Sequence, residues 1–234
     1  MNIAILSDIH ANSVALDAVF NSPRFRDVDA LIVAGDFVGY YFDPKYVIDR
    51  IRSLKMPTYC VRGNHEEMLL EAINNPSQLH NYILRYGPGL SIALEQLVDI
   101  DLEWISNLPH PLFINDFSCS FLICHGSPSS IDEYIYPDNS LTDLLCCVDN
   151  DPTVIIMGHT HYSFVRQLDH CLIINPGSVG QPRNRIPGAH WALFDTSTMN
   201  VSMFVEPYDF LDLQDKCRVV APHHPYLHEV LTRL

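Results

Sequence analysis

Short, unbroken apolar runs rich in β-branched residues recur along the chain, and they constrain its fold more than any other feature. They occupy residues 3–6, 30–34, 58–61, 117–124, 153–157, 171–174, 190–194 and 201–205. Runs without polar alternation are typical of strands that are covered on both faces. Helical spacing separates several of them, at residues 11–21 and 44–54. This alternation predicts an α/β fold, and the short turns between the later runs predict a mixed sheet in the second half.

We expect the apolar stripes of the two early helices to face the sheet. The stripe residues are Val14, Ala15, Ala18 and Val19 on one helix and Tyr46, Val47, Ile51 and Leu54 on the other.

Residues 66–108 have a different pattern, which is mostly helical and is broken by Asn-Asn-Pro and Gly-Pro-Gly. We interpret this stretch as a helical segment inserted between two strands. The sequence predicts a single domain over residues 1–234, with this insertion and a weakly patterned tail at about 207–234.

The composition excludes some classes of function. A net charge of −14 argues against a long nucleic acid as partner, although bound cations would still allow a small phosphorylated substrate. The seven cysteines form no CxxC pair, and we expect reduced thiols in a cytoplasmic protein. No basic leader segment opens the chain, and no apolar run reaches the roughly 18 residues of a membrane span. The sequence makes no prediction of oligomeric state.

Five short polar islands stand where apolar runs end. They are Asp8-Ile9-His10, Gly35-Asp36, Gly63-Asn64-His65-Glu66, His125-Gly126 and Gly158-His159-Thr160-His161. The carboxyl ends of strands form the ligand crevice of open α/β sheets, so we expect the islands to converge. In an extended chain, residues two apart point to the same side, which would pair Asp8 with His10 and His159 with His161.

Each island alone has an ordinary explanation. Gly-Asp is common in turns, and a histidine after an apolar run is often only hydrogen-bonded. The ordered set of five favours a metal site, because carboxylate, imidazole and amide groups are metal ligands and small glycines beside them allow close backbone approach.

The same ordered set resembles the calcineurin-like metallophosphoesterases, whose pattern is DxH, GD, GNH[DE], a histidine after a strand, and GHxH. Residues 35–40 and 175–183 are similar to the small bacterial and archaeal phosphodiesterase group within that superfamily. The resemblance extends over about residues 1–205 and is poor in the tail.

The resemblance implies a four-layer α/β/β/α sandwich with two mixed β-sheets and a centre of two divalent metal ions. It assigns Asp8, His10, Asp36 and His161 to one ion. It assigns Asp36, Asn64, His125 and His159 to the other, with Asp36 as the bridge. Oxygen and nitrogen ligands without thiolate suit manganese first, and also iron, zinc, cobalt or nickel.

The implied activity is that of a binuclear-metal-dependent phosphoesterase, and a phosphodiesterase above all, in which a metal-bridging hydroxide attacks the phosphate ester. Two carboxylates, two divalent ions and one hydroxide leave a net charge of about +1, which would attract a phosphate ester. A phosphomonoesterase, a dinucleoside polyphosphate hydrolase and a non-catalytic metal-binding scaffold stay open as alternatives.

By the same resemblance His65 is the catalytic residue, which stabilises the transition state or protonates the leaving oxygen. Many relatives orient this histidine with an aspartate at the position of Gly39. Because glycine cannot do so, the orienting partner of His65 stays open, and Asp43 and a backbone carbonyl are the two candidates.

The remaining candidates concern the substrate. Arg183 is a candidate phosphate contact or a solvated loop residue, and Asn12 is a candidate phosphate contact or a helix cap. Tyr40, Tyr41 and Tyr134 are candidate stacking groups or simple packing residues. We expect residues 66–108 to wall one side of the site.

Overall fold

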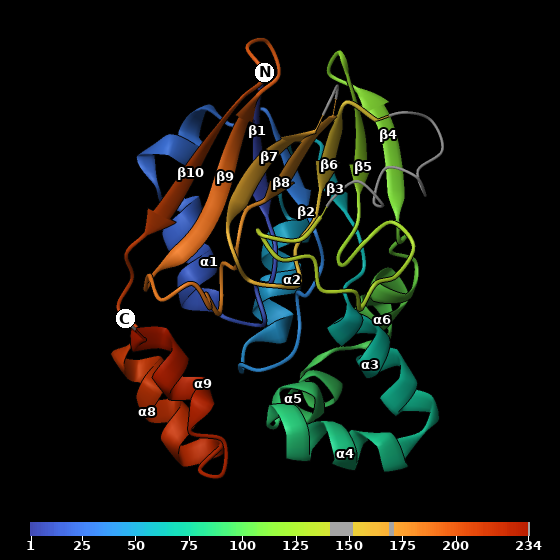
Figure 1. The fold of residues 1–234 in the computed structure, drawn as a ribbon. Coiled ribbons are helices and arrows are strands. Elements are labelled where there is room, and N and C mark those ends of the chain that lie inside the picture. Colours follow the sequence, from blue (N-terminus) through green and yellow to red (C-terminus); the bar gives the residue numbers. More distant parts are fainter. Residues whose placement is uncertain (141–151, 169–170, 234) are drawn as a thin grey trace.

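Two mixed sheets of five strands pack face to face in the computed structural model, which describes residues 1–140, 152–168 and 171–233 (Figure 1). The first sheet has the order β10-β9-β1-β2-β3. Its strands are β1 (Asn2–Leu6), β2 (Ala30–Val33), β3 (Thr58–Cys60), β9 (Ala189–Asp195) and β10 (Asn200–Glu206). The second sheet has the order β4-β5-β6-β8-β7. Its strands are β4 (Leu112–Asp116), β5 (Cys119–Ile123), β6 (Val154–Ile156), β7 (Phe164–Leu168) and β8 (Cys171–Asn175).

The unbroken apolar runs are explained by burial on both faces. In β1, Ile3 and Ile5 belong to the core between the two sheets, whereas Ala4 and Leu6 belong to the core under the helices. Alternate residues of a strand point to opposite faces, so a strand covered on both sides has no position for a polar residue. This confirms the interpretation for β1, β2, β6 and β8, which are almost entirely buried, whereas β10 is an edge strand with several exposed residues.

Helices α1 (Ser13–Phe20) and α2 (Pro44–Arg52) cover the outer face of the first sheet, beside the short 3-10 helix η1 (Pro23–Asp27). Two residues of the predicted stripes are misplaced, because Val14 is 40% exposed and Tyr46 is 44% exposed. Leu16 and Ile48 are buried in their place. Ala15 and Val19 on α1 and Val47 and Ile51 on α2 are buried as the stripes predicted.

The apolar pattern missed β4 and β7, which are the two edge strands of the second sheet. Edge strands pair on one side only and are partly exposed, so they do not need an unbroken apolar run. The predicted strand at 117–124 also begins later, at Cys119, because Phe117 and Ser118 have φ values of 55° and 64°. Two successive residues with positive φ are typical of a tight hairpin turn, here between β4 and β5.

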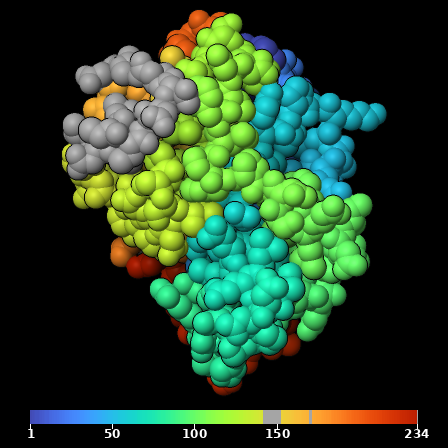
Figure 2. Space-filling model, turned by 90° about the vertical axis from the view of Figure 1, so that its right-hand side faces the viewer, coloured from blue at the N-terminus to red at the C-terminus, as the bar shows by residue number. Residues whose placement is uncertain are grey.

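Residues 66–108 are helical as predicted, although the first helix begins two residues earlier. The segment contains α3 (Asn64–Asn74), α4 (Pro76–Tyr86), α5 (Gly89–Gln96) and α6 (Asp99–Ser106), with breaks at the two predicted positions. In Figure 2 it occupies the lower part of the visible face, in cyan-green to green, and meets residues 125–140 in yellow-green.

The tail forms α8 (Leu211–Val220), α9 (Tyr226–Glu229) and the 3-10 helix η2 (Val230–Thr232). Its apolar residues Leu213 and Leu227 pack with Tyr41 and Phe42, which follow β2, and with Tyr86 of α4. The tail and the helical segment thus lie at the same end of the sandwich (Figure 1).

A further small core, which includes Cys124, Ile155 and Ile173, lies on the outer face of the second sheet and packs with Ile135. The outer helical layer expected on this face falls outside the residues that the structure describes. Within the described ranges, no helix has both the length and the apolar character needed to cross a bilayer.

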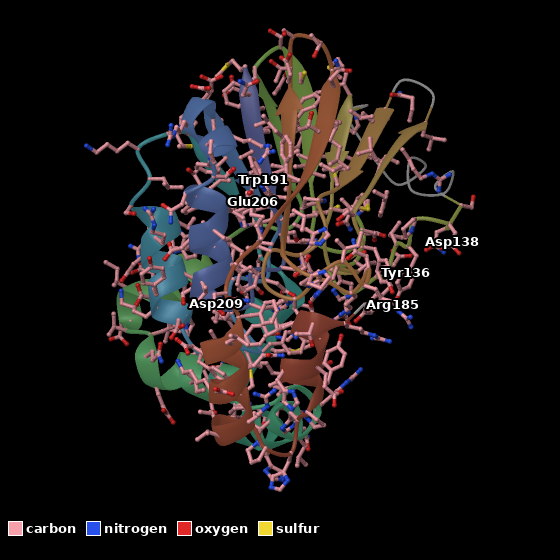
Figure 3. All side chains as sticks on the ribbon, turned by 90° about the vertical axis from the view of Figure 1, so that its left-hand side faces the viewer. Tyr136, Asp138, Arg185, Trp191, Glu206 and Asp209 are labelled. Carbon is pink, nitrogen blue, oxygen red and sulfur yellow. The ribbon has the colours of Figure 1, made fainter. Side chains whose placement is uncertain are left out.

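Glu206 links the end of β10 to the core between the first sheet and its helices. Its buried carboxylate accepts hydrogen bonds from Trp191 Nε1 at 3.2 Å and Ser22 Oγ at 2.8 Å (Figure 3). We predict that Glu206→Ala lowers the free energy of unfolding by about 1–3 kcal/mol, because two buried donors lose their acceptor. Urea denaturation measures this, and Glu206→Gln, which keeps an acceptor oxygen, should lose less. Equal losses in the two variants would contradict the account.

Candidate metal centre

The five polar islands meet at one end of the two sheets. Asp8 and His10 follow β1, Asp36 follows β2, and Asn64 and His65 open α3 after β3. His125 follows β5, while His159 and His161 follow β6. All eight side chains are buried. The carboxyl ends of neighbouring parallel strands therefore bring together residues from the whole length of the chain, as the sequence predicted.

The backbone at the islands is not extended, which corrects the prediction from two-residue spacing. Asp8 and His10 have φ values of 53° and 51°, and His159 and His161 have 65° and 61°. Asp36 is also left-handed, at 58°. This conformation costs about 1–3 kcal/mol for a residue other than glycine and is concentrated at functional sites. The paired side chains reach one site because the backbone kinks at each of them.

Asp8, His10 and His161 form a first group of potential ligands. His10 Nδ1 lies 3.0 Å from the Val38 carbonyl, and His161 Nδ1 contacts the Gln181 carbonyl. Each carbonyl requires a proton on Nδ1, so each Nε2 presents a lone pair. These two Nε2 atoms are 3.1 Å apart. Two facing lone pairs repel each other unless a cation lies between them.

Asn64, His125 and His159 form a second group of the same kind. His125 Nδ1 is 2.7 Å from the Ala34 carbonyl, which leaves its Nε2 as an acceptor when the ring is neutral. That Nε2 lies 3.0 Å from Asn64 Oδ1, which is also an acceptor, so a neutral His125 and Asn64 face one another without a shared proton. His159 Nδ1 lies 3.1 Å from the same oxygen and donates to it in the tautomer that carries the proton on Nδ1.

Asp36 lies between the two groups. Its Oδ2 is 3.5 Å from His10 Nε2 in the first group and 3.3 Å from His125 Nε2 in the second. Its Oδ1 accepts the backbone N–H of His65 at 3.0 Å, which fixes the carboxylate. One carboxylate thus faces both sets of imidazoles.

The donor set fits divalent cations. Ligand atoms bound to one ion at about 2.0–2.2 Å stand about 3 Å apart, which is close to the separations seen here. Asp8 Oδ1 is buried without a hydrogen-bond partner and lies 3.3 Å from His161 Nε2. A cation would satisfy this oxygen together with the facing lone pairs.

Glu66 is the last residue of the Gly-Asn-His-Glu motif. The sequence alone gave it no role, but the structure shows one. Its buried carboxylate accepts the backbone N–H groups of Asp36, Phe37, Val38 and Gly63 at 2.8–3.0 Å. Burial and the charge of Asp36 raise the pKa of Glu66 to about 7, while the N–H groups favour the ionised form. The sequence feature that could have revealed this role is the position of Glu66 as the third residue of α3, because a glutamate there reaches back to the backbone at the start of the helix.

His65 is enclosed by aromatic rings. Its ring centroid is 4.8 Å from that of His10, 4.7 Å from Tyr40 and 5.3 Å from Tyr86. A ring nitrogen of His65 also lies within 4.8 Å of ligand atoms of His10 and Asp36. Burial lowers the pKa of His65 to about 4, so the imidazole is neutral at pH 7.

Neither of the two candidates left open as orienting partner of His65 takes that place in the structure. Asp43 accepts hydrogen bonds from Ser13 Oγ at 2.7 Å and Lys216 Nζ at 3.1 Å instead. Among the described residues, His65 Nδ1 has no hydrogen-bond partner, so no backbone carbonyl serves either. A Cβ atom on Gly39 would lie 2.1 Å from His65 Nδ1, because the ring fills the space beside that glycine.

Arg183 and Asn12 differ in their surroundings. Arg183 Nη2 donates to Tyr40 Oη at 3.2 Å, and the Tyr40 ring packs 4.5 Å from that of His10. The guanidinium therefore lies beside the centre, where its contact with phosphate stays a prediction. Asn12 is buried; its Oδ1 accepts from Ala15 N, and its Nδ2 donates to the Gly180 carbonyl and Tyr208 Oη. These bonds match the helix-cap alternative and disfavour a substrate contact.

The three candidate tyrosines also differ in what they contact. Tyr41 is fully buried and donates to the Leu227 carbonyl, so it is a packing residue. Tyr40 contacts His10, and Tyr134 lies 4.0 Å from the ring of His159. Because Tyr86 of α4 contacts His65, the helical segment does wall one side of the cluster, as predicted.

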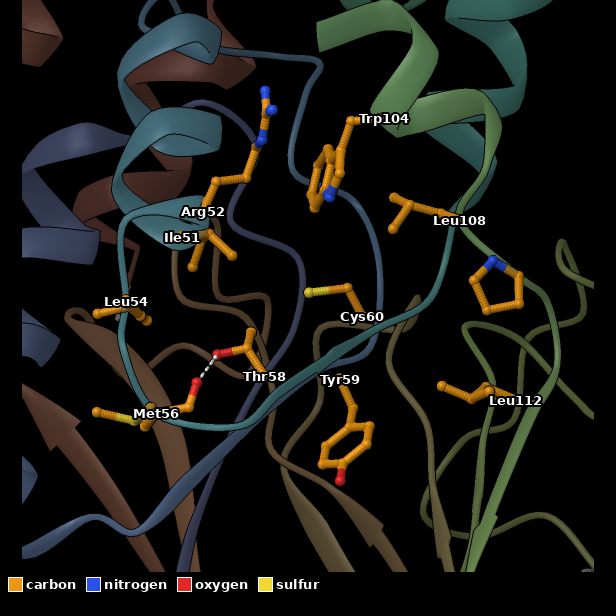
Figure 4. Close-up of a pocket in the computed structure, with 11 residues that line it drawn as sticks. Ile51, Arg52, Leu54, Met56, Thr58, Tyr59, Cys60, Trp104, Leu108 and Leu112 are labelled. Carbon is orange, nitrogen blue, oxygen red and sulfur yellow. Dashed lines mark hydrogen bonds between the residues drawn. The ribbon is translucent and has the colours of Figure 1, made fainter. Parts of the chain in front are cut away.

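A separate cavity of about 560 Å³ opens between α2, β3 and α6 (Figure 4). Its walls include Ile51, Cys60, Trp104 and Leu112. None of the metal-ligand candidates lines it.

Comparison with known proteins places this arrangement among phosphoesterases. The family model of the calcineurin-like phosphoesterase superfamily domain matches residues 1–199. A metallophosphoesterase from Sphaerobacter thermophilus has a similar structure, with a TM-score of 0.80, 29% identity and coverage of 100% of this chain and 98% of that chain. An uncharacterized protein of Methanocaldococcus jannaschii is 29% identical over 92% of this chain and 90% of its own length. A phosphodiesterase of the same organism is 24% identical, over 76% and 83% respectively.

The four N–H bonds to Glu66 lead to a test. We predict that Glu66→Gln lowers the free energy of unfolding by about 1–3 kcal/mol and weakens metal binding, because an amide NH₂ would face backbone donors. Denaturant titration and metal analysis of the purified protein measure both effects. The adjacent Glu67→Gln is the matched control, since Glu67 makes only a half-exposed ion pair with Arg62. If the two variants had the same stability and the same metal content, Glu66 would have no positioning role.

Metal binding should release a proton. Burial opposes charge on His125, but the carboxylates of Asp36 and Asp8 raise its pKa to about 10 in the metal-free protein. Burial instead lowers the pKa of His10, His159 and His161, so these are already neutral. At pH 7 a divalent ion must therefore displace about one proton, and affinity should rise by up to about tenfold per pH unit below pH 10.

Calorimetry with Mn²⁺ in buffers of different ionisation enthalpy counts this proton. The exposed His80 provides the control, because His80→Ala should leave the proton count unchanged. An affinity that does not change between about pH 6 and pH 8 would contradict the assignment of the proton to His125.

Proposed function

Because the chain belongs to the calcineurin-like phosphoesterase superfamily and is a metal-dependent phosphoester hydrolase, we propose that it cleaves phosphodiesters at a centre of two divalent ions. The position of Asp36 carries this proposal. Its Oδ2 stands within 3.5 Å of an Nε2 atom from each group of imidazoles. A shared carboxylate is what two ions about 3.5–4 Å apart require.

We assign Asp8, His10, Asp36 and His161 to one ion and Asp36, Asn64, His125 and His159 to the other. When bound, the ions would polarise the phosphoryl oxygens and supply the nucleophilic hydroxide expected from the sequence. Manganese suits these oxygen and nitrogen donors, and iron, zinc, cobalt and nickel suit them as well.

The chain's own residues then orient the ester and stabilise its developing charge. Neutral His65 retains one ring N–H, which can donate a hydrogen bond but is a poor acid. Of the two roles left open by the sequence, stabilisation of the transition state therefore suits it better than protonation of the leaving oxygen. Arg183 carries a permanent positive charge beside the centre and would hold a non-bridging phosphate oxygen.

The preference for diesters is supported by the name of the phosphodiesterase relative from Methanocaldococcus jannaschii. Phosphomonoesters and dinucleoside polyphosphates offer the metals the same phosphoryl group and remain the alternative substrates. The net charge of −14 makes a small phosphorylated molecule a more suitable partner than a long nucleic acid.

Two variants test the proposal on bis(p-nitrophenyl) phosphate with added Mn²⁺. We expect His65→Ala to keep its metal and to lower kcat by about 10²–10⁴, because it loses transition-state stabilisation. Asp36→Asn should lose metal and activity together, since the shared carboxylate charge is gone. Metal analysis and initial rates measure both, with His80→Ala as the control. Wild-type rates in either variant would overturn the mechanism.

A further inference from the structure

A cavity of about 290 Å³ lies between helix α4 and the segment that leads into α9 of the tail. Its walls include Tyr40, Arg85, Tyr86, Tyr226 and Glu229. The tail approaches α4 closely here, because His224 Nε2 lies 3.2 Å from the Leu84 carbonyl and Leu227 packs against Gly87. The cavity therefore depends on residues beyond 199, where the match to the family model ends.

This cavity adjoins the candidate metal centre through two of its rings. The Tyr40 ring is 4.5 Å from that of His10 and 4.7 Å from that of His65. Tyr86 is 5.3 Å from His65 and 6.0 Å from Tyr40. Tyr40 and Tyr86 therefore form a wall that the cavity shares with the metal centre.

The walls combine aromatic faces with one guanidinium group, because Arg85 Cζ lies 4.9 Å over the Tyr86 ring. Arg183 is not one of the wall residues, but its Nη2 donates to Tyr40 Oη. Glu229 supplies a carboxylate on the tail side. Tyrosine faces stack on flat aromatic groups, guanidinium groups add cation–π and hydrogen-bond contacts, and an alkyl substituent would gain little from either.

We propose that this cavity is a subsite for the nucleoside part of a nucleotide phosphodiester, whose base stacks against Tyr86 and Tyr226. The inference rests on the proposed function and adds the substrate class. The cavity volume of about 290 Å³ is just below the usual range for small-molecule sites, about 300–1,000 Å³, so it has room for one nucleoside and not for an oligonucleotide.

Two esters with the same leaving group test this subsite with Mn²⁺-loaded protein. One is thymidine 5′-(p-nitrophenyl phosphate) and the other is methyl p-nitrophenyl phosphate. We expect kcat/KM to be at least about tenfold higher for the thymidine ester, because stacking of one base contributes at this level. Equal values for the two esters in the wild-type protein would overturn the subsite.

Variants of Tyr226 locate the preference, since this residue is 39% exposed and is not one of the metal-ligand candidates. Tyr226→Ala should lower the ratio of the two kcat/KM values by about tenfold, whereas Tyr226→Phe, which keeps the ring, should preserve it. Tyr46→Ala is the matched control, because Tyr46 is similarly exposed but lies on α2. A Tyr226→Ala variant that lowers both values by the same factor would contradict a specific stacking role.

Binding of thymidine without phosphate separates this inference from the proposed function. Saturation-transfer NMR on the EDTA-treated full chain should detect thymidine on the wild-type and Tyr226→Phe proteins and not on Tyr226→Ala. Thymidine binding without hydrolysis of either ester would support the subsite and refute the proposed function. Hydrolysis of both esters without thymidine binding would refute the subsite alone.

Discussion

Buried acceptor atoms that face one another are the constraint on which the rest of this structure depends. Neutral imidazoles and carboxylates lie within about 3–4 Å of each other with no shared hydrogen between several pairs. Burying even one unpaired polar group costs about 1–3 kcal/mol, and this cluster contains several. A metal-free chain relieves part of that cost by holding a proton on His125, whereas divalent cations would relieve all of it at once. Cation binding and stability of this end of the molecule are thus coupled.

The framework that holds these atoms in place is mostly backbone. The Nδ1 atoms of His10, His125 and His161 are fixed by main-chain carbonyls, so their ring orientations do not depend on other side chains. Glu66 adds a link between the loop after β2 and the start of α3, because one carboxylate gathers four N–H groups from both. This link places Asp36 against the first turn of α3, where it accepts the His65 N–H. The left-handed kinks at Asp8, Asp36 and His159 are held by the same packing of loops at the ends of the strands.

Much of this arrangement could be predicted from the sequence, for reasons that are physical. Doubly covered strands must be apolar throughout, so β1, β2 and β8 stand out as unbroken runs, and polar residues at their ends mark the crevice. The edge strands β4 and β7 have no such requirement and escaped prediction. The kinked backbone at Asp8 and His10 escaped it as well, because two-residue spacing is compatible with both extended and left-handed conformations. The partners of Asn12 and Asp43 depend on residues far along the chain, Gly180, Tyr208 and Lys216, and no local pattern contains that information.

The glycine at position 39 connects the chemistry of His65 to the shape of the neighbouring cavity. With no carboxylate there, the imidazole is oriented by ring packing against Tyr40 and Tyr86, and it fills the space that a Cβ on residue 39 would occupy. Those two tyrosines also wall the cavity beside the tail. A group that stacks on Tyr86 would therefore contact a ring that also packs against His65 and orients it. In the function that we propose, recognition of the substituent and orientation of His65 would use the same aromatic surface, so a stacked substituent would favour the reactive geometry by reducing the freedom of His65.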